Sequence, residues 1–149
     1  TGVVKRYITD FGTEDLLNKP NVTVFPHVGG STGEAELNCA IMAGQTIRRF
    51  METGEIVNSV NFPRVQQALS APYRITLINK NVPNIVARIS TAVSDFNINI
   101  DNIINRSKGD YAYTLLDLDE TDKEKIDELV AKFEASDNIV RVRLIKGKK

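Results

Sequence analysis

His27 is the only histidine of the chain, and it is the residue of this stretch that suits proton transfer. Histidine is the one side chain whose unperturbed pKa lets it gain and lose a proton near neutral pH. Gly29 and Gly30 follow it, and paired glycines allow a tight turn whose backbone comes close to a bound molecule. The stretch indicates either a catalytic general acid and base or, as the simpler alternative, a histidine in a surface turn.

Two elements are expected to position this histidine. The apolar run from Val22 to Phe25 predicts a buried strand, and Pro26 ends it because proline cannot donate to a strand ladder. Ser31 and Glu34 have the spacing of a capping box, which predicts a helix start. His27 is therefore expected between a strand end and a helix N-terminus, at the edge where open α/β sheets bind ligands.

A carboxylate stands at the end of the preceding strand. Val3 to Phe11 has the β-branched and aromatic weighting of a strand, and Asp10 lies at its C-terminal end. If this strand runs parallel to the next one, Asp10 and His27 share one edge of the sheet. The alternative, which the residues alone favour, is a strand-end cap or a solvated carboxylate.

A long helix is predicted from about Thr32 to Thr53, with Gly54 as the residue that ends it. Cys39 is expected to pack on the buried face rather than to react. That face is predicted from apolar residues at three-to-four spacing: Ala35, Cys39, Met42, Thr46, Ile47 and Phe50.

The composition excludes several classes of protein. The 149 residues include 19 basic and 19 acidic side chains, and a formal net charge of zero argues against a dedicated nucleic-acid binder. One cysteine excludes an internal disulfide and a cysteine-rich zinc site, and no metal is expected. No apolar run reaches membrane-spanning length, so we expect no membrane partner and a cytoplasmic location. Thr1 in place of Met indicates a processed, truncated or engineered start.

From Tyr73 onward the pattern alternates between strands and helices in the order β-α-β-β-α-β. This order predicts a ferredoxin-like unit with two helices on one face of an antiparallel sheet. Residues 64–72 are predicted to be a linker. The expected elements are a strand at Arg74–Asn79, a helix with Pro83 in its first turn, a strand through Ile98, Ile100 and Ile104, a strand at Tyr111–Asp119, a helix after a capping box of Thr121 and Glu124, and a strand through Val140, Val142 and Leu144.

Three motifs in the first part of the chain resemble the C-terminal third of D-3-phosphoglycerate dehydrogenases. They are Tyr7–Phe11, Asn21–Thr32 and Glu55–Pro63, in the family's order and spacing. The resemblance implies that His27 exchanges a proton with the substrate hydroxyl. It also implies that Asp10 lies by the nicotinamide of NAD, whose site the backbone of Gly29 and Gly30 borders.

The family's glutamate partner, substrate arginine and dinucleotide fingerprint have no match in this chain. NAD is therefore implied for an intact enzyme, while this chain alone is expected to be inactive and to hold no cofactor.

The second part of the chain, residues 73–145, resembles an ACT domain, an amino-acid-sensing module that follows many phosphoglycerate dehydrogenases. The resemblance lies in the loop that carries Asn79, Asn81, Pro83 and Asn84, which implies binding of an effector's amino and carboxylate groups. Asn99 matches a residue that closes on the effector across a dimer interface. The family's usual histidine and glycine are replaced here by Asn79 and Asn84.

Serine is the candidate effector. Dimerisation without a ligand, and asparagines that serve only the backbone of a turn, are the alternatives. An open edge strand leads us to expect a homodimer or a higher homo-oligomer through this domain.

Together these features predict an α+β fold with four parts. Residues 1–63 are the end of a Rossmann-type dehydrogenase region with a long helix, 64–72 a linker, 73–145 the ACT domain and 146–149 a tail. The first hypothesis is part of a phosphoglycerate dehydrogenase, and the alternative is a free-standing ligand-binding module. RNA binding through Tyr111 and Tyr113 is a third hypothesis, which the zero net charge and the missing aromatic-glycine motif disfavour.

Overall fold

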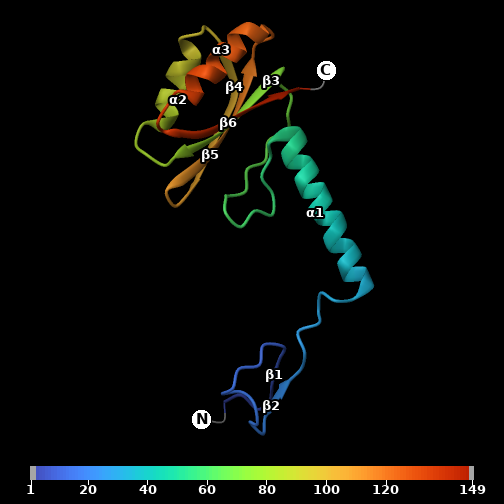
Figure 1. Cartoon of the computed structure of the whole chain (residues 1–149). Coiled ribbons are helices and arrows are strands. Elements are labelled where there is room, and N and C mark those ends of the chain that lie inside the picture. The colour runs from blue at the N-terminus through green and yellow to red at the C-terminus, as the bar shows by residue number, and fades with distance from the viewer. Residues whose placement is uncertain (1–2, 148–149) are drawn as a thin grey trace. The chain divides into compact units, whose positions relative to one another are not determined.

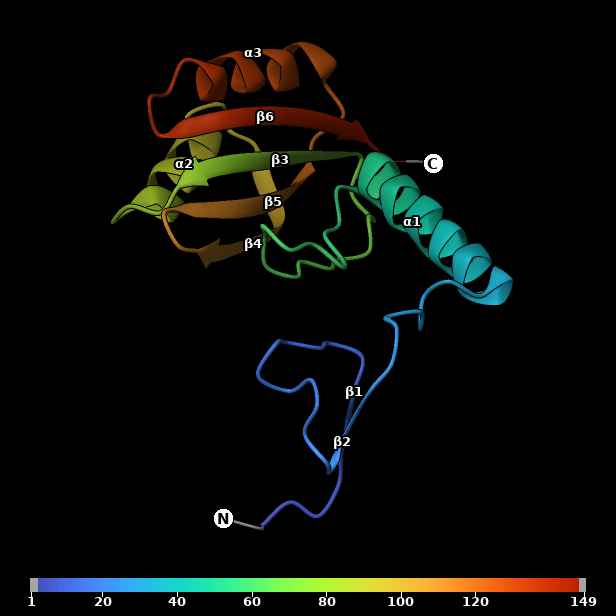
Figure 2. The same ribbon diagram turned by 60° about the horizontal axis from the view of Figure 1, so that its bottom comes forward.

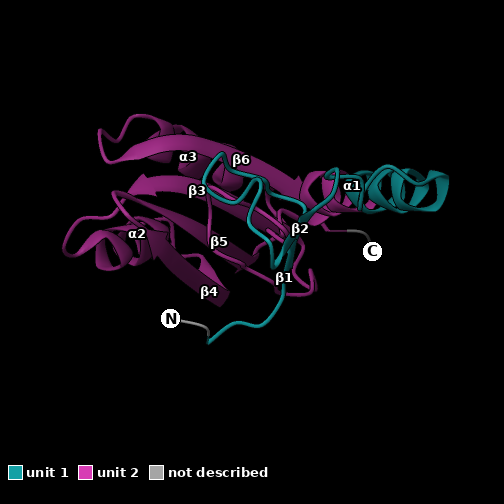
Figure 3. Ribbon diagram, turned by 90° about the horizontal axis from the view of Figure 1, so that it is seen from below, with its two compact units in different colours: residues 1–44 teal, residues 45–149 magenta. Residues whose placement is uncertain are grey.

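The structure, a computed structural model, describes residues 3–147 and divides the chain into two compact units, 1–44 and 45–149 (Figure 3). Thr1 and the last two residues of the predicted tail lie outside the described residues. Lys146 ends the last strand, and the Gly147 amide donates to the Pro72 carbonyl at 2.8 Å. The described part of the predicted tail therefore belongs to the second unit's sheet.

The first unit contains two short parallel strands, β1 (Tyr7–Thr9) and β2 (Val22–Val24) (Figure 1). β1 is shorter than the predicted strand Val3–Phe11, because its only described partner is three residues long. Val3 and Val4 are consequently exposed. The parallel direction is the one that places both strand ends at one edge.

Helix α1 (Gly33–Thr53) begins one residue later than the predicted start at Thr32. The Thr32 hydroxyl accepts a hydrogen bond from the Ala35 amide at 3.1 Å, so Thr32 is the N-cap. The predicted capping box of Ser31 and Glu34 is therefore wrong, because the threonine next to Ser31 supplies the same oxygen one residue further on.

Gly54 ends α1 as predicted. Its φ is +72°, and its amide donates to the Phe50 carbonyl at 2.9 Å. A side-chain carbon added at Gly54 would come within 2.5 Å of a Thr76 methyl group. Glycine is required here both by the backbone angle and by the neighbouring sheet.

The apolar face predicted for α1 is not buried in the described residues. Cys39 is exposed, and Met42 and Ile47 are more than half exposed. The prediction was wrong because three-to-four spacing reports a face suited to burial, whereas burial requires a packed partner. Among the described residues of the first unit, the other regular structure is the pair of three-residue strands.

The second unit holds an antiparallel sheet in the order β4-β5-β3-β6, with two helices on one face (Figure 2). The predicted ferredoxin-like β-α-β-β-α-β order is confirmed. The elements are β3 (Tyr73–Lys80), α2 (Ile85–Ser94), β4 (Asn99–Lys108), β5 (Tyr111–Asp119), α3 (Lys123–Glu134) and β6 (Ile139–Lys146).

Helix α3 begins at a different cap from the one predicted. The Asp122 carboxylate accepts from the Glu124 amide at 3.0 Å, so Asp122 is the N-cap and the predicted box of Thr121 with Glu124 is wrong. The Glu120 carboxylate accepts from the amides of Thr121 and Asp122, and these two bonds are the main reason that its pKa is lowered.

Apolar residues cover both faces of this sheet because central strands alternate their side chains. The helix face packs against α2 and α3 through twelve buried residues: Tyr73, Ile75, Leu77, Ile85, Ile89, Val93, Ile98, Leu116, Leu118, Ile126, Leu129 and Phe133. The opposite face, called the outer face here, contains a smaller cluster of Ile56, Val65, Tyr113 and Leu115.

Residues 54–72, called the cover segment, lie on the outer face (Figure 2). Ile56 and Val65 pair through two backbone hydrogen bonds of 2.8 and 3.0 Å, and Val65 is 1% exposed. The predicted linker, 64–72, is therefore part of the packed unit, because β3 and β5 leave an apolar surface on this side that needs covering.

Arg74 fastens the cover segment to the sheet. Its guanidinium forms a two-bond pair with Asp117 at 2.5 and 2.7 Å, and both side chains are 0% exposed. Its other three N–H groups donate to the carbonyls of Thr53, Gln67 and Ala68 at 2.9 to 3.1 Å. All five donors are satisfied, which is the condition for burying a charge at low cost.

Candidate functional site

The first unit brings His27 and Asp10 together. The Asp10 carboxylate lies 3.2 Å from His27 Nδ1, and the two side chains are 58% and 33% exposed for histidine and aspartate. The Phe11 ring meets the imidazole edge-on with centroids 4.5 Å apart. The parallel strands thus place both residues at one edge, as the sequence predicts for parallel strands.

This contact has the length of an ion pair, which forms when the imidazole is protonated. It engages Nδ1 and leaves Nε2 as the other ring nitrogen that can bond to a second molecule. Histidine and carboxylate therefore form a contacting pair on a surface open to solvent.

Gly29 and Gly30 have no packing reason to be glycine in the described residues. A side-chain carbon added at either would meet no other atom within 4 Å, and neither has a positive φ. Open backbone beside His27 fits the border of a nicotinamide site. The chain has no glycine-rich dinucleotide turn, so these residues fit only that border and not the rest of NAD.

The predicted effector loop follows β3 and is fixed by the turn between β4 and β5. The Asn81 side-chain amide donates to the Gly109 carbonyl at 3.0 Å, and its backbone amide donates to the Asp110 carbonyl at 2.8 Å. Pro83 is exposed beside it.

Asn84 caps α2 in the left-handed conformation, with φ of 63°, and its side chain makes no capping bond. Asparagine is the residue other than glycine that tolerates this region best, which explains why it replaces the family's glycine. The amides of the first turn of α2 consequently have no side-chain cap, an arrangement suited to a carboxylate.

Asn79 is placed differently from the other asparagines of the loop. It is 0% exposed, and its carbonyl oxygen accepts from the Thr114 hydroxyl at 2.8 Å. Asn105 donates to that hydroxyl at 2.7 Å, and Asn79 donates to the Lys80 carbonyl at 3.0 Å. Both ends of the amide are engaged, so Asn79 supports the loop from within the sheet instead of facing a ligand.

Asn99 lies at the far end of the same sheet. It pairs with Asp119, whereas Lys80 and Lys108 both pair with Tyr111 at the other end of β5. Nine residue steps at roughly 3.3 Å separate the two ends of β4 by about 30 Å. Within one chain the structure does not bring Asn99 to the loop.

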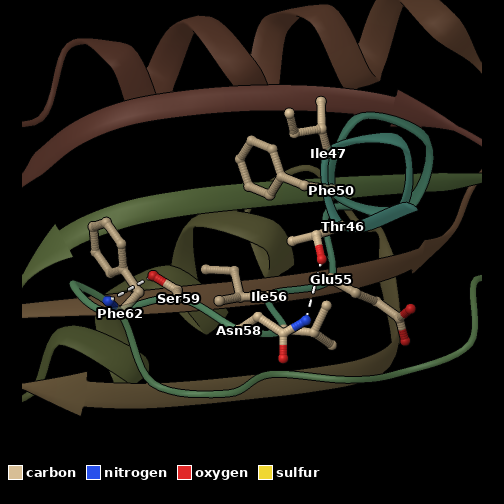
Figure 4. A pocket seen from close by; sticks show the side chains of 9 residues that line it. Thr46, Ile47, Phe50, Glu55, Ile56, Asn58, Ser59 and Phe62 are labelled. Carbon is tan, nitrogen blue, oxygen red and sulfur yellow. Dashed lines mark hydrogen bonds between the residues drawn. The ribbon is translucent and has the colours of Figure 1, made fainter. Parts of the chain in front are cut away.

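An apolar pocket of about 300 Å³, absent from the sequence interpretation, lies between the last turns of α1 and the cover segment (Figure 4). Ile47, Phe50 and Ile56 form its walls. Two of its polar side chains bond to each other, with the Asn58 amide donating to the Thr46 hydroxyl at 3.1 Å, and the Ser59 hydroxyl accepts from the Phe62 amide at 3.1 Å. No sequence motif marks this pocket, because it forms only where distant segments meet.

Two other properties concern the described residues. Among residues 3–147, no three histidine, cysteine or carboxylate side chains gather as metal ligands. No helix in that range combines the length and hydropathy needed to cross a bilayer.

Comparison with curated proteins gives relatives along most of the chain. It is 30% identical over 139 residues to D-3-phosphoglycerate dehydrogenase 2 of Saccharomyces cerevisiae and 26% identical over 133 residues to the D-3-phosphoglycerate dehydrogenase of Escherichia coli. Each alignment covers 89% of this chain but only 29% and 32% of the two relatives. The predicted resemblance to these dehydrogenases is confirmed, and no family model matches the chain.

Solved structures resemble about half of the chain. An ACT domain of a GTP pyrophosphokinase from Chlorobium tepidum matches 49% of the chain and 95% of its own length, at 18% identity and a TM-score of 0.45. An ACT domain protein from Streptococcus pneumoniae matches 50% and 86%, at 23% identity and a TM-score of 0.43. The ferredoxin-like fold itself is established by the strand order of the chain.

Proposed function

We propose that this chain is the C-terminal part of an NAD-dependent D-3-phosphoglycerate dehydrogenase whose residues 73–145 are a dimerising, amino-acid-sensing ACT domain. Such an enzyme oxidises 3-phosphoglycerate to 3-phosphohydroxypyruvate, the first step of serine biosynthesis. The observation behind the sensing function is that Asn99 and the loop of residues 79–84 lie at opposite ends of the sheet. A site that contains both must therefore form between two copies of the chain.

An antiparallel pairing of two β4 edges resolves that separation. β4 is an edge strand, and no strand among residues 3–147 pairs with its free side. Two-fold pairing places the Asn99 end of one copy beside the Lys108 end of the other, where the loop around Asn81 and Asn84 lies. Pairing through the β6 edge would leave Asn99 far from the loop of the second copy, so we propose that the dimer forms through β4.

The chemistry of the joined site suits a free amino acid. The uncapped first turn of α2 favours the effector's carboxylate, and asparagine amides can accept from its ammonium group. Serine remains the proposed effector because its hydroxyl offers a further hydrogen bond to such amides.

The test uses two variants that are each defective in one half of the site. Asn81→Ala removes a loop residue and Asn99→Ala removes the residue proposed to come from the second copy. Calorimetry should show serine binding by the native chain and none by either variant alone. A refolded equal mixture should recover about a quarter of the native sites, because half of its dimers carry one intact site of two.

Failure takes distinguishable forms. A monomer by light scattering would contradict the dimer. A dimer that binds no amino acid would contradict sensing and favour the free-standing dimerisation module. A mixture that recovers no binding would contradict the shared site while leaving sensing intact.

We also propose that His27 is the acid/base of the intact dehydrogenase. Nε2 would take the proton of the substrate hydroxyl, with a glutamate from the upstream region as the partner of His27 and with Asp10, 3.2 Å from Nδ1, beside the nicotinamide. NAD, when bound by the intact enzyme, supplies the hydride acceptor, and Gly29 and Gly30 leave room at its border.

This role predicts different results for the chain alone and for a longer enzyme. Residues 1–149 with NAD and 3-phosphoglycerate should produce no NADH, and measurable turnover would contradict that expectation. In a chain that includes the upstream catalytic region, His27→Asn should lower kcat by a factor of about 10² to 10⁴. An unchanged kcat would exclude His27 from the chemistry.

A further inference from the structure

We propose that the outer face of the sheet carries a second small-molecule site, which takes an organic anion with an apolar body and a carboxylate or phosphate group. The site is a pocket of about 260 Å³ at the β6 edge, bordered by Arg141 and Arg143. It lies wholly within the second unit, and it does not depend on the proposed function.

The strand register explains how the two arginines come to the same face. Arg141 pairs with Ile78 and Arg143 pairs with Thr76, so both side chains project on the outer side with those of β3. Tyr113 of β5 pairs with Ile78 from the other side. A row of Arg141, Ile78 and Tyr113 therefore crosses the pocket, with a cation at its open edge.

Arg141 has no ion-pair or side-chain hydrogen-bond partner among residues 3–147, and it is exposed. Arg143, in contrast, is committed: its guanidinium donates to the carbonyls of Phe50 (2.9 Å) and Met51 and lies 5.0 Å from the Phe50 ring. None of the pocket's described lining residues is acidic. The free guanidinium of Arg141 is therefore the group available to an anion, and the fixed charge of Arg143 adds to the positive potential.

Further cations surround this end of the outer face. Arg106 pairs with Tyr113 on the β4 side, so its side chain continues the same row. Lys80 ends β3 two residues beyond Ile78 and projects on the same side. The pocket thus lies in a basic part of a chain whose net charge is zero.

The floor of the pocket is apolar. Phe50, Met51 and Ile78 line it, and Tyr113 is 2% exposed with its hydroxyl bonded to the Gly54 carbonyl at 2.7 Å. The volume is slightly below the range of about 300 to 1,000 Å³ usual for small-molecule sites. Such a floor fits one aromatic ring or a short aliphatic body. Inorganic phosphate has no apolar part, so contact with the floor adds nothing to its affinity.

The experiment titrates the full chain with phenyl phosphate and phenylacetate, followed by calorimetry and by backbone NMR. Inorganic phosphate and benzyl alcohol are the two halves of the ligand and test whether both are needed. Binding of the two organic anions should shift the amide signals of Ile78, Tyr113 and Arg141. Each half should bind at least tenfold more weakly.

The variant Arg141→Gln should weaken phenyl phosphate binding at least tenfold, which is about 1.4 kcal/mol. Arg88→Gln, which removes an exposed arginine of α2, is the matched control and should change the affinity less than twofold. Equal urea midpoints of both variants would show that folding is unaffected.

Three results would overturn the site: no binding of either organic anion at millimolar concentration, equal affinity in Arg141→Gln, or shifts confined to the loop of residues 80–84. The last result would assign the anion to the effector loop. A fourth result, unchanged affinity when the apolar body is omitted, would also overturn the site, because general charge attraction would then account for the binding.

Discussion

Arg74 and Asp117 show how one buried side-chain pair organises distant parts of the chain. The guanidinium joins β3 to β5 through Asp117, and it joins both strands to the end of α1 through the Thr53 carbonyl and to the cover segment through the carbonyls of Gln67 and Ala68. A sequence pattern cannot reveal this, since an arginine in a strand beside Tyr73 and Ile75 is ordinarily expected to face solvent. Only the return of residues 53–68 over the sheet makes Arg74 a core residue.

Removing one member of this pair should destabilise the chain strongly. Asp117→Ala leaves the Arg74 charge buried without its counterion, so we expect a loss of about 3 to 5 kcal/mol in the free energy of unfolding. Urea unfolding measures it. Asp127→Ala, which breaks the exposed pair with Lys123, is the control and should cost less than about 1 kcal/mol. Equal effects of the two variants would contradict the view that Arg74 holds the cover segment.

The Tyr113 phenol should make stability depend on pH in the alkaline range. Burial raises the pKa of Tyr113 above its usual value of 10.0, despite an opposing hydrogen bond with Thr76. Above pH 10 the unfolded chain therefore loses this proton while the folded chain retains it. The stabilising contribution is complete below pH 10 and declines as the pH rises toward the folded-state pKa.

Tyr113→Phe should accordingly show a shallower decline of the urea midpoint between pH 9 and pH 11 than the native chain. Tyr111→Phe, at an exposed position of the same strand, is the control and should follow the native curve. Parallel curves for all three proteins would contradict the assignment to Tyr113.

At the scale of elements, α1 is the part whose ends were more predictable than its environment. Gly54 was identified as the terminating residue because local backbone geometry decides that position. The N-cap was misplaced by one residue because Ser31 and Thr32 offer equivalent hydroxyls. The expected burial of Met42 and Cys39 failed because it depends on neighbours beyond the helix.

Two glycine-to-alanine changes in or beside α1 should have opposite effects. Gly54→Ala requires a left-handed alanine and crowds Thr76, so it should destabilise the chain by about 1 to 2 kcal/mol or more. Gly44→Ala lies inside the helix with no atom within 4 Å of the new carbon, so it should stabilise by roughly 0.5 to 1 kcal/mol. Thermal unfolding measures both changes, and effects of the same sign would contradict this account of the helix end.

For the molecule as a whole, the β-α-β-β-α-β order was predictable because each of its elements carries its own periodicity. The His27–Asp10 contact was also accessible, since it requires only that two strands run parallel. The opposite positions of Asn99 and the asparagine loop were not, because strand order and direction decide them, and the buried position of Asn79 depends on Thr114 of another strand.

The packed cover segment changes where the second unit should be cut. A chain of residues 45–149 should be more stable than a chain of residues 73–149. Deleting 45–72 exposes Tyr113 and Leu115 and removes buried Ile56 and Val65, a loss of roughly 3 to 6 kcal/mol of apolar burial. Urea midpoints and binding of a hydrophobic dye compare the two chains. Equal urea midpoints of the two chains would contradict a packed role for the cover segment and would support the interpretation of residues 64–72 as a linker.

The two hydrogen bonds between Ile56 and Val65 have one further consequence, for the rate at which backbone amides exchange with solvent. An isolated pair in a surface segment ordinarily exchanges through local fraying. Here the Arg74 contacts hold the pair against the outer face of the sheet. The amide protons of Ile56 and Val65 can therefore exchange only when the sheet itself opens. In deuterated water these two amides should therefore be protected from exchange for as long as those of Ile75 and Leu115. The cover segment and the sheet should open as one cooperative unit.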